Sequence, residues 1–538
     1  MSSLFSRASG LLLHFTSLPA RPLGTASDGQ PGTDGPWSAG DLGSGDLGPS
    51  AYEFVRFLKR SGQRWWQILP TGPTGYGFSP YQSPSSFAGN PLLVSPALMA
   101  RDGLLKAEDW HDIAIAGSGG SVDWSRTQME SSASKRMELL RMAFRRFQHQ
   151  RQDLHGHLDQ FRHEQSDWLE EHCLFTACKN FHNDASWNDW EQPLRRRDEQ
   201  AIANWSEKLR VACEFEAFIQ FVFDRQWQEL RQYASANGVG IIGDIPIFVA
   251  MDSSDVWSMQ QLFELDDTGN PTVVAGVPPD YFAILGQRWG NPLYRWPEHD
   301  RTGYAWWVRR FKRMLQLCDL LRIDHFRGFE AYWEIPASLP DARIGEWRPG
   351  PRDDFFRALQ SALGGSIPVI AEDLGYITDE VRNLRDRFHF PGMKVIQFGF
   401  GGASGKSMDL PHHYPVHSIA YTGTHDNDTT VGWFQSELGE GSSRTQQLID
   451  SEKAFALRYL RCDGSQIHLG VLRAVWSSAS CVAIAPVQDI LGLPASARMN
   501  TPGTSTGNWA WRCEPGLMDQ RVGEMLLEVT DTYDRVLG

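Results

Sequence analysis

Eight short apolar runs recur along this chain of 538 residues, and most of them are separated by stretches with the apolar spacing of a helix. The runs lie near residues 11, 66, 241, 320, 369, 395, 419 and 483. Apolar runs of this length, bounded by turn signals, are typical of buried strands. Strands that alternate with helices predict a parallel sheet. Eight such units predict an α/β fold, the (β/α)8 TIM barrel.

Two longer segments interrupt the alternation. Residues 71–238 are mostly helical in pattern, since Ser131–Arg162 and Arg197–Gly238 are rich in Glu, Gln and Arg and carry apolar residues three to four apart. Residues 250–304 form a long irregular stretch with many turn signals, and loops of this length are usually lids or binding segments. We therefore predict one catalytic barrel domain over residues 1–538, with large insertions in these two places and no separate C-terminal β domain.

Composition excludes several classes of protein. The net charge is −14, whereas nucleic-acid binding requires clustered Lys and Arg. No apolar stretch reaches the roughly 18 residues of a membrane span, and Leu11–Leu13, interrupted by His14, is interpreted as a first strand rather than a signal peptide. The seven cysteines form no CxxC and no metal-ligand spacing. We expect a cytoplasmic protein that needs no metal or cofactor and binds neither nucleic acid nor membrane.

Three of the predicted strands end in or near carboxylates. These are Asp324, Glu372 and Asp426, which lie 48 and 54 residues apart. In a barrel, the carboxyl ends of the strands meet at one mouth, where active sites lie. A single carboxylate there is more often a structural ion-pair or capping group. Three of them, with Arg322 and His425 beside them, favour a catalytic site.

The neighbouring charges suggest different protonation states, and so different roles, for the carboxylates. Arg322 and Asp324 are two residues apart and so share one face of a strand, where a guanidinium favours the ionised carboxylate. Glu372 would need a raised pKa to serve as a proton donor. One ionised and one protonated carboxyl group is the pattern of glycoside chemistry. This reasoning leaves two choices open: Glu372 or Asp373, and Asp426 or Asp428.

Loops rich in Gly and Pro supply candidate binding segments. Thr71–Gln82 carries two tyrosines and lacks the Gly-Lys-Ser/Thr ending of a phosphate loop. The chain also has twenty-one tryptophans. A tryptophan is more often a core residue, but its flat apolar body also suits the C–H face of a sugar. Only tryptophans in Gly/Pro-rich loops, such as Trp289, are therefore interpreted as functional.

Long blocks of the sequence resemble the signature blocks of amylomaltases, the 4-α-glucanotransferases (disproportionating enzymes) of glycoside hydrolase family 77 in the α-amylase clan. The similarity runs from about residue 10 to about residue 515. The similar blocks are Gly75–Gln82, Gly243–Ala250, Val274–Phe282, Arg322–Gly328, Ala371–Gly375, Thr424–Asp428 and Gly507–Trp511.

The resemblance implies a retaining enzyme that transfers α-1,4-glucan segments from a donor maltooligosaccharide to the 4-hydroxyl of an acceptor glucan or glucose. It implies that Asp324 is the nucleophile that forms a covalent glucosyl-enzyme. Glu372 would be the acid and base, and Asp426 would hold the hydroxyls of the distorted sugar. The substrate-binding residues that it implies are Tyr76, Tyr81, Asp244, Gln287, Trp289, Asn291, Arg322, His325 and His425.

The sequence departs from the family pattern in four places, none at the carboxylates, and two of them bear on acceptor preference and product size. About two dozen residues, near 21–44, look inserted, and Ala283–Leu285 replaces a more polar stretch. We predict that Ala283–Leu285 alters the preferred length of donor or acceptor. Two alternatives remain: a hydrolase with the same carboxylates, and a glucan-binding protein on an inactive barrel. The intact carboxylates argue against the second. The oligomeric state stays open.

Overall fold

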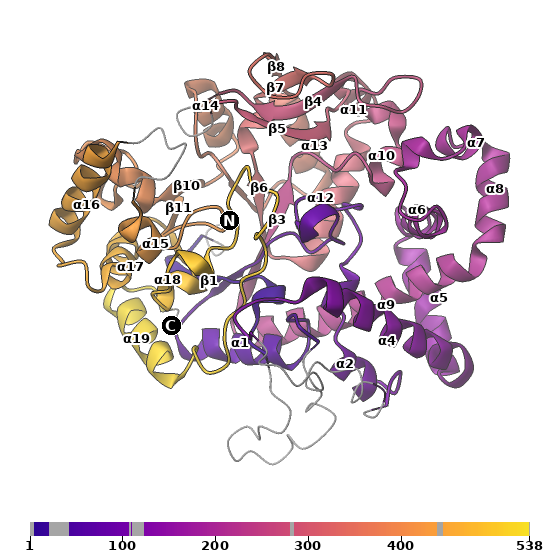
Figure 1. The fold of residues 1–538 in the computed structure, drawn as a ribbon, viewed down its shortest axis with the longest axis horizontal. Coiled ribbons are helices and arrows are strands. Elements are labelled where there is room, and N and C mark those ends of the chain that lie inside the picture. Colours follow the sequence, from indigo (N-terminus) through magenta and orange to yellow (C-terminus); the bar gives the residue numbers. More distant parts are fainter. Residues whose placement is uncertain are drawn as a thin grey trace.

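The barrel is closed by eight parallel strands. The computed structural model describes residues 5–20, 42–106, 109, 123–279, 284–437 and 445–536. Around the barrel the order is β1-β12-β11-β10-β9-β6-β3-β2 (Figure 1). The strands are β1 (Ala8–Leu12), β2 (Trp65–Gln67), β3 (Gly240–Pro246), β6 (Leu320–Asp324), β9 (Val369–Ala371), β10 (Gly392–Val395), β11 (Ser418–Tyr421) and β12 (Val482–Pro486). The eight predicted strands and the (β/α)8 barrel are confirmed.

Helices pack around the outside of the barrel strands. Their inner faces and the outward-facing strand residues share one large apolar core, and a smaller cluster fills the barrel interior. Strands that are covered on both sides explain the nearly continuous apolar runs in the sequence. The surrounding helices are α1 (Pro49–Arg60), α9 (Arg210–Ala236), α12 (Ala305–Leu317), α13 (Arg352–Ala362), α14 (Asp379–Arg387), α17 (Ile467–Ser477) and α19 (Gln520–Thr532). Further out, α16 (Gln446–Leu460) packs on α17 and on the 3-10 segment η10 (Ile396–Ala403).

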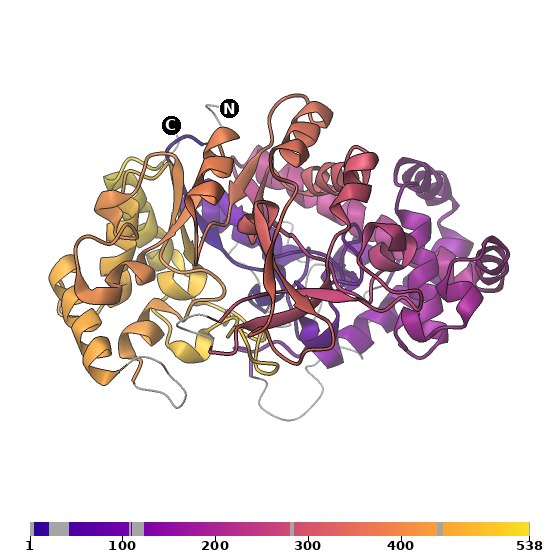
Figure 2. The same cartoon turned by 90° about the horizontal axis from the view of Figure 1, so that it is seen from above.

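The segment between β2 and β3 is helical, as the sequence predicted. Its helices extend the molecule to one side of the barrel (Figures 1 and 2). They pack on the long helix α9, mainly through α6. Besides α9 they are α2 (Pro96–Arg101), α4 (Met129–Gln150), α5 (His155–Glu164), α6 (Leu169–Phe181), α7 (Gln192–Arg195) and α8 (Glu199–Lys208).

A second sheet, which the sequence did not predict, lies above β3 and β6 in Figure 1. Its four antiparallel strands, in the order β5-β4-β7-β8, are β4 (Val273–Val277), β5 (Gln287–Pro292), β7 (Ala331–Pro336) and β8 (Glu346–Pro349). The expectation that residues 250–304 are irregular is therefore wrong. Glycine and proline obscure the strand pattern of β4 and β5, and β4 is paired to β7, which lies about sixty residues further along the chain. Short helices also occur here and near the barrel rim: α10 (Ser254–Ser258), α11 (Trp296–Arg301), α15 (Thr430–Gln435) and α18 (Val487–Ile490).

No helix within the described ranges is both long and apolar enough to cross a membrane. Of the inserted stretch near 21–44, residues 21–41 lie outside the described residues, as does Ala283. The single-domain organisation remains a prediction.

Candidate active site

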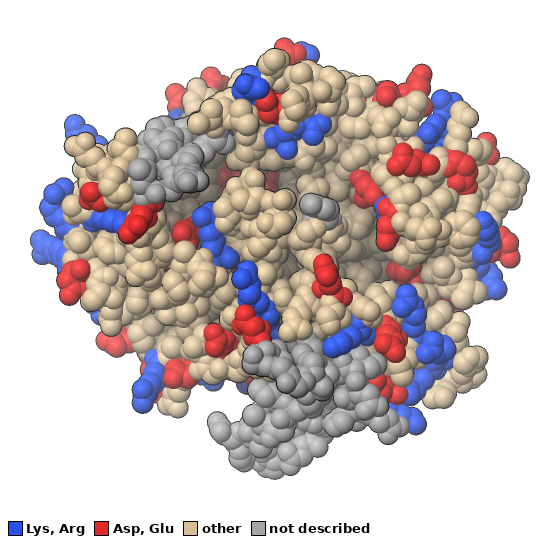
Figure 3. Space-filling model, in the orientation of Figure 1, with Lys and Arg blue, Asp and Glu red and all other residues tan. Residues whose placement is uncertain are grey.

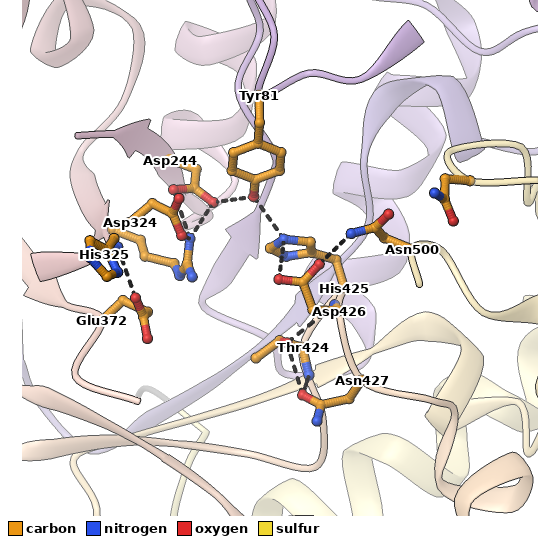
Figure 4. A network of polar contacts seen from close by, with 12 residues as sticks. Tyr81, Asp244, Asp324, His325, Glu372, Thr424, His425, Asp426, Asn427 and Asn500 are labelled. Carbon is orange, nitrogen blue, oxygen red and sulfur yellow. Dashed lines mark hydrogen bonds and ion pairs between the residues drawn. The ribbon is translucent and has the colours of Figure 1, made fainter. Parts of the chain in front are cut away.

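The three predicted carboxylates surround one end of the barrel. Asp324 is the last residue of β6, Glu372 directly follows β9, and Asp426 lies in the loop after β11. Figure 4 shows them around a shared opening, and Figure 3 shows that this face of the molecule is hollowed near its centre. The structure thus brings together residues that are about a hundred positions apart, because parallel strands place their carboxyl ends at the same rim.

Arg322 lies between two aspartates. Its Nη1 is 2.9 Å from Asp324 Oδ1 and 2.8 Å from Asp244 Oδ2. Asp244 and Arg322 are directly paired in the register of β3 and β6. Leu320 belongs to the interior cluster of the barrel, so Arg322 and Asp324, at two-residue intervals, continue the same inward face. Asp244, Arg322 and Asp324 are therefore all positioned by the barrel strands themselves.

Burial and the charge of Arg322 shift the pKa of Asp324 in opposite directions. Burial raises the pKa of Asp324 above its ordinary value, and the guanidinium of Arg322 works against this rise. The sequence predicted the contact between Arg322 and Asp324, and the structure contains it. The sequence did not reveal that burial raises the pKa of Asp324 more than Arg322 lowers it. The effect of burial depends on every residue that packs around the carboxylate, and these residues come from distant parts of the chain.

Glu372 has the properties of a proton donor. Its carboxylate accepts hydrogen bonds from the backbone N–H groups of His325, at 2.8 Å, and Leu374, at 2.9 Å. Burial raises its pKa to about 7, while Arg322 lowers it and Asp324 adds to the rise. A group with this pKa can donate and accept a proton near neutral pH.

The neighbouring carboxylate, Asp373, is occupied elsewhere. It forms an ion pair with Arg385 and accepts a hydrogen bond of 2.8 Å from the N–H of Met393 on β10. Its side chain is 6% exposed. The structure thus separates the two acids that the sequence could not distinguish: Glu372 faces Asp324, and Asp373 supports the adjacent strand.

A similar division separates Asp426 from Asp428. The Asp426 side chain is 43% exposed, and its Oδ1 accepts a hydrogen bond of 2.6 Å from Asn500 Nδ2. The carboxylate of Asp428 instead accepts the backbone N–H of Thr429 at 2.8 Å, just before α15. Asn500 was not predicted. It lies seven residues before the block at Gly507–Trp511, and an isolated asparagine in a loop gives no pattern to detect.

Tyr81 joins the two sides of the site. Its hydroxyl donates to Asp244 Oδ2 at 2.7 Å and lies 2.9 Å from His425 Nε2 (Figure 4). Because the single hydroxyl proton goes to Asp244, the oxygen accepts from a protonated Nε2 of His425. The two rings are also stacked, with centroids 5.2 Å apart. The loop at Thr71–Gln82, singled out in the sequence, therefore reaches the barrel mouth.

The predicted binding residues of β5 differ in their surroundings. The Trp289 ring meets His325 edge to face, with centroids 4.9 Å apart, and its Nε1 donates to Gln287 Oε1 at 3.2 Å. Asn291 is buried, and its Nδ2 donates to the carbonyl of Val249 at 2.8 Å. Trp289 and Gln287 thus lie near the site, whereas the amide of Asn291 holds β5 against the barrel.

The predicted binding residue Tyr76 lies in the 3-10 turn η3 (Tyr76–Phe78). Its side chain is outside the described part of the structure.

Among the described residues, no group of three or more His, Cys, Asp or Glu side chains is arranged to hold a metal ion.

Comparison with known proteins agrees with this arrangement. The family model described as 4-alpha-glucanotransferase (glycoside hydrolase family 77) matches residues 37–518. The 4-alpha-glucanotransferase of Thermus thermophilus is 44% identical over 98% of this chain and 99% of its own length. That of a Synechocystis species is 42% identical over 99% of both.

A solved structure extends the similarity to three dimensions. The amylomaltase of Streptococcus agalactiae, in complex with acarbose, matches with a TM-score of 0.89 and 36% identity, covering 99% of this chain and 100% of that one. The similarity thus spans the whole barrel, its helical insertion and the strand ends that carry the three carboxylates. This chain therefore belongs to the 4-α-glucanotransferases of glycoside hydrolase family 77.

Proposed function

We propose that the protein is a retaining 4-α-glucanotransferase that moves α-1,4-glucan segments from a donor maltooligosaccharide to the 4-hydroxyl of an acceptor. The observation that carries this proposal is the pairing of Asp324, held by Arg322 at 2.9 Å, with Glu372, whose pKa is raised to about 7. A nucleophile and an acid of this kind are what a retaining glycosidic reaction requires.

In the first step, an oxygen of Asp324 forms a bond to the anomeric carbon of the donor. The glycosidic bond breaks, and Glu372 gives its proton to the leaving 4-oxygen. In the second step, the 4-hydroxyl of the acceptor attacks the same carbon, the bond to Asp324 breaks, and the Glu372 carboxylate takes up the hydroxyl proton. Two inversions at one carbon retain the α configuration.

The surrounding residues would bind the sugar whose bond is broken. Asp426, exposed at the opening and oriented by Asn500, would accept hydrogen bonds from its hydroxyls and stabilise positive charge in the transition state. The Arg322–Asp244 pair and the Tyr81–His425 pair would bind the same sugar and hold its pocket rigid. Gln287, Trp289 and His325 would line the path of the neighbouring sugars, and Asn291 would support them from behind.

Incubation with pure maltotriose tests the reaction. Transfer produces glucose and a ladder of longer chains while total reducing ends stay constant. The main alternative is hydrolysis by the same carboxylates, in which water instead of an acceptor reaches the intermediate and reducing ends rise. An unchanged maltotriose solution would contradict both reactions and favour a binding protein.

We also propose that the enzyme acts on α-1,4-glucans in the cytoplasm, without nucleic-acid or membrane partners. All seven cysteines are free, which suits a reducing compartment. Acidic and basic side chains are interspersed on the face in Figure 3, which suits an uncharged substrate.

A further inference from the structure

Two aromatic rings enclose one buried arginine beside the candidate acid. The guanidinium carbon of Arg327 lies 3.9 Å from the ring centroid of Trp347 and 5.6 Å from that of Tyr376. Arg327 is 7% exposed, and its Nη1 donates to the backbone carbonyl of Tyr376. Trp347 in turn meets Trp333 edge to face, with centroids 5.3 Å apart. Cation–π contacts and a hydrogen bond thus hold the position of Tyr376.

The arrangement lies close to the reacting groups. Arg327 is three residues after Asp324, in the 3-10 helix η9 (Phe326–Phe329), and Tyr376 is four residues after Glu372. Four residues span at most about 14 Å even when fully extended. The two segments are also joined by the bond of 3.2 Å from the N–H of Phe326 to the carbonyl of Glu372. Tyr376 is therefore on the Glu372 side of the opening.

The ring of Tyr376 is not buried by the contacts that hold it. Tyr376 is 75% exposed, the largest exposed fraction among the exposed large apolar and aromatic side chains in the described residues. It lies three residues before the start of α14. An exposed aromatic surface stabilises the fold little, because it stays in water. An aromatic ring that is held in place and exposed to solvent is preorganised for binding, because little conformational freedom is lost when a ligand covers it.

We propose that Tyr376 is a stacking platform for the acceptor chain, beyond the first acceptor sugar, and that Arg327 and Trp347 are its positioning residues. This inference rests on the proposed function. Because Glu372 protonates the leaving oxygen, the leaving chain and the acceptor that replaces it both lie on the Glu372 side. The ligand is thus a glucan whose C–H faces cover an aromatic ring.

Acceptor competition tests the platform. With maltoheptaose as donor and labelled glucose or labelled maltotetraose as acceptor, we would compare kcat/KM for the two acceptors. Tyr376→Ala is expected to lower the ratio of maltotetraose to glucose about three- to tenfold, the loss of one aromatic contact. Tyr376→Phe should keep the ratio, since the ring remains. Trp347→Ala should lower it in part, and Trp347→Phe should restore it.

Phe181→Ala is a matched control. Phe181 is 49% exposed on α6, and Lys208 Nζ lies 3.9 Å from its ring centroid, so it too is an exposed ring beside a cation, but in the helical insertion. Its removal should leave the acceptor ratio unchanged. If Tyr376→Ala and Phe181→Ala give the same ratio as the wild type, the platform is refuted.

A binding measurement separates this inference from the proposed reaction. In an Asp324→Asn background, calorimetry with maltoheptaose measures affinity without turnover. An additional Tyr376→Ala substitution should raise the Kd about three- to tenfold, and an equal Kd would overturn the platform. Absence of transfer by the wild type, with a raised Kd for the double variant, would refute the proposed reaction alone.

Discussion

The carboxylate of Glu372 accepts a hydrogen bond of 2.8 Å from the backbone N–H of His325, the residue that follows Asp324. His325 has a φ of 55°, a left-handed conformation that is uncommon for a residue with a side chain. The turn at the end of β6 therefore directs a main-chain donor at the candidate acid. The Glu372 carboxylate is thus held by the backbone next to Asp324, and substitution of the His325 side chain does not remove this hydrogen bond.

Asp324→Asn should reduce transfer from maltotriose by about 10³-fold or more, because an amide cannot form the glucosyl ester. Asparagine has nearly the same shape and still accepts a hydrogen bond from Arg322. The variant should therefore fold, with an unfolding transition near that of the wild type. Turnover at the wild-type rate by a pure preparation would refute Asp324 as the nucleophile.

The activity of the wild type should fall as the pH rises above about 7, because Glu372 must be protonated to act as an acid and its pKa is raised to about 7. Glu372→Gln should abolish this limb of the pH–rate profile together with most of the activity. A glucosyl fluoride donor needs no proton on its leaving group, so it should restore the first step in the variant. Failure of the fluoride to react faster than maltotriose would contradict this role.

The same pKa predicts how stability changes with pH. Because the folded protein holds the proton of Glu372 more tightly than the unfolded chain, whose glutamate pKa is near 4.5, this stabilisation is complete below about pH 4.5. It is lost as the pH rises through about 7. The difference in unfolding free energy between wild type and Glu372→Gln should therefore move in favour of the variant between pH 5 and 8. Denaturant titrations across this range give the measurement, and a difference that is constant with pH would contradict the raised pKa.

Tyr81→Phe removes the hydroxyl that joins Asp244 to His425 but keeps the stacked ring. We expect kcat/KM to fall about tenfold and the unfolding free energy to fall by about 1–2 kcal/mol, since His425 Nε2 loses its partner at 2.9 Å and keeps only the longer contact of 3.4 Å to Asp426 Oδ2. Tyr294→Phe is the control, because the buried Tyr294 hydroxyl donates to the carbonyl of Ile247 at 2.7 Å. The control should lose similar stability and keep more activity. Equal activity losses in both variants would mean that the Tyr81 hydroxyl acts only through stability.

The apolar stretch near Leu285 should influence product length. Ile284 and Leu285 are 71% and 51% exposed, so a glucan beside the β4–β5 hairpin would contact them. Replacing Ala283 by Ser together with Leu285 by Thr should change the distribution of chain lengths formed from maltotriose. Val416→Thr, also at an exposed apolar residue but before β11 at the opposite end of the barrel, should not. Identical product ladders from all three proteins would contradict the prediction.

Local sequence patterns were sufficient to predict the eight barrel strands and the strand ends that carry the site. Each of the eight strands is recognisable because a strand covered on both sides needs an apolar run, and a run is a property of neighbouring residues. The order of strands around a barrel then places Asp324, Glu372 and Asp426 at one rim without further information. Arg322 could be assigned to the face of Asp324 because side chains alternate along a strand.

What only the tertiary structure decided depends on partners that are distant in the sequence. Arg385 and Met393 engage Asp373 and so leave Glu372 for the site. The carbonyl of Val249 accepts a hydrogen bond from Asn291, and β4 pairs with the distant strand β7. Desolvation likewise raises the pKa of Asp324 against the nearby charge of Arg322. The sequence by itself determines that the strand ends and their acids meet at the barrel mouth. Which acid faces the site, and how it is protonated, is decided by packing, because hydrogen bonds and burial arise only when separate segments meet.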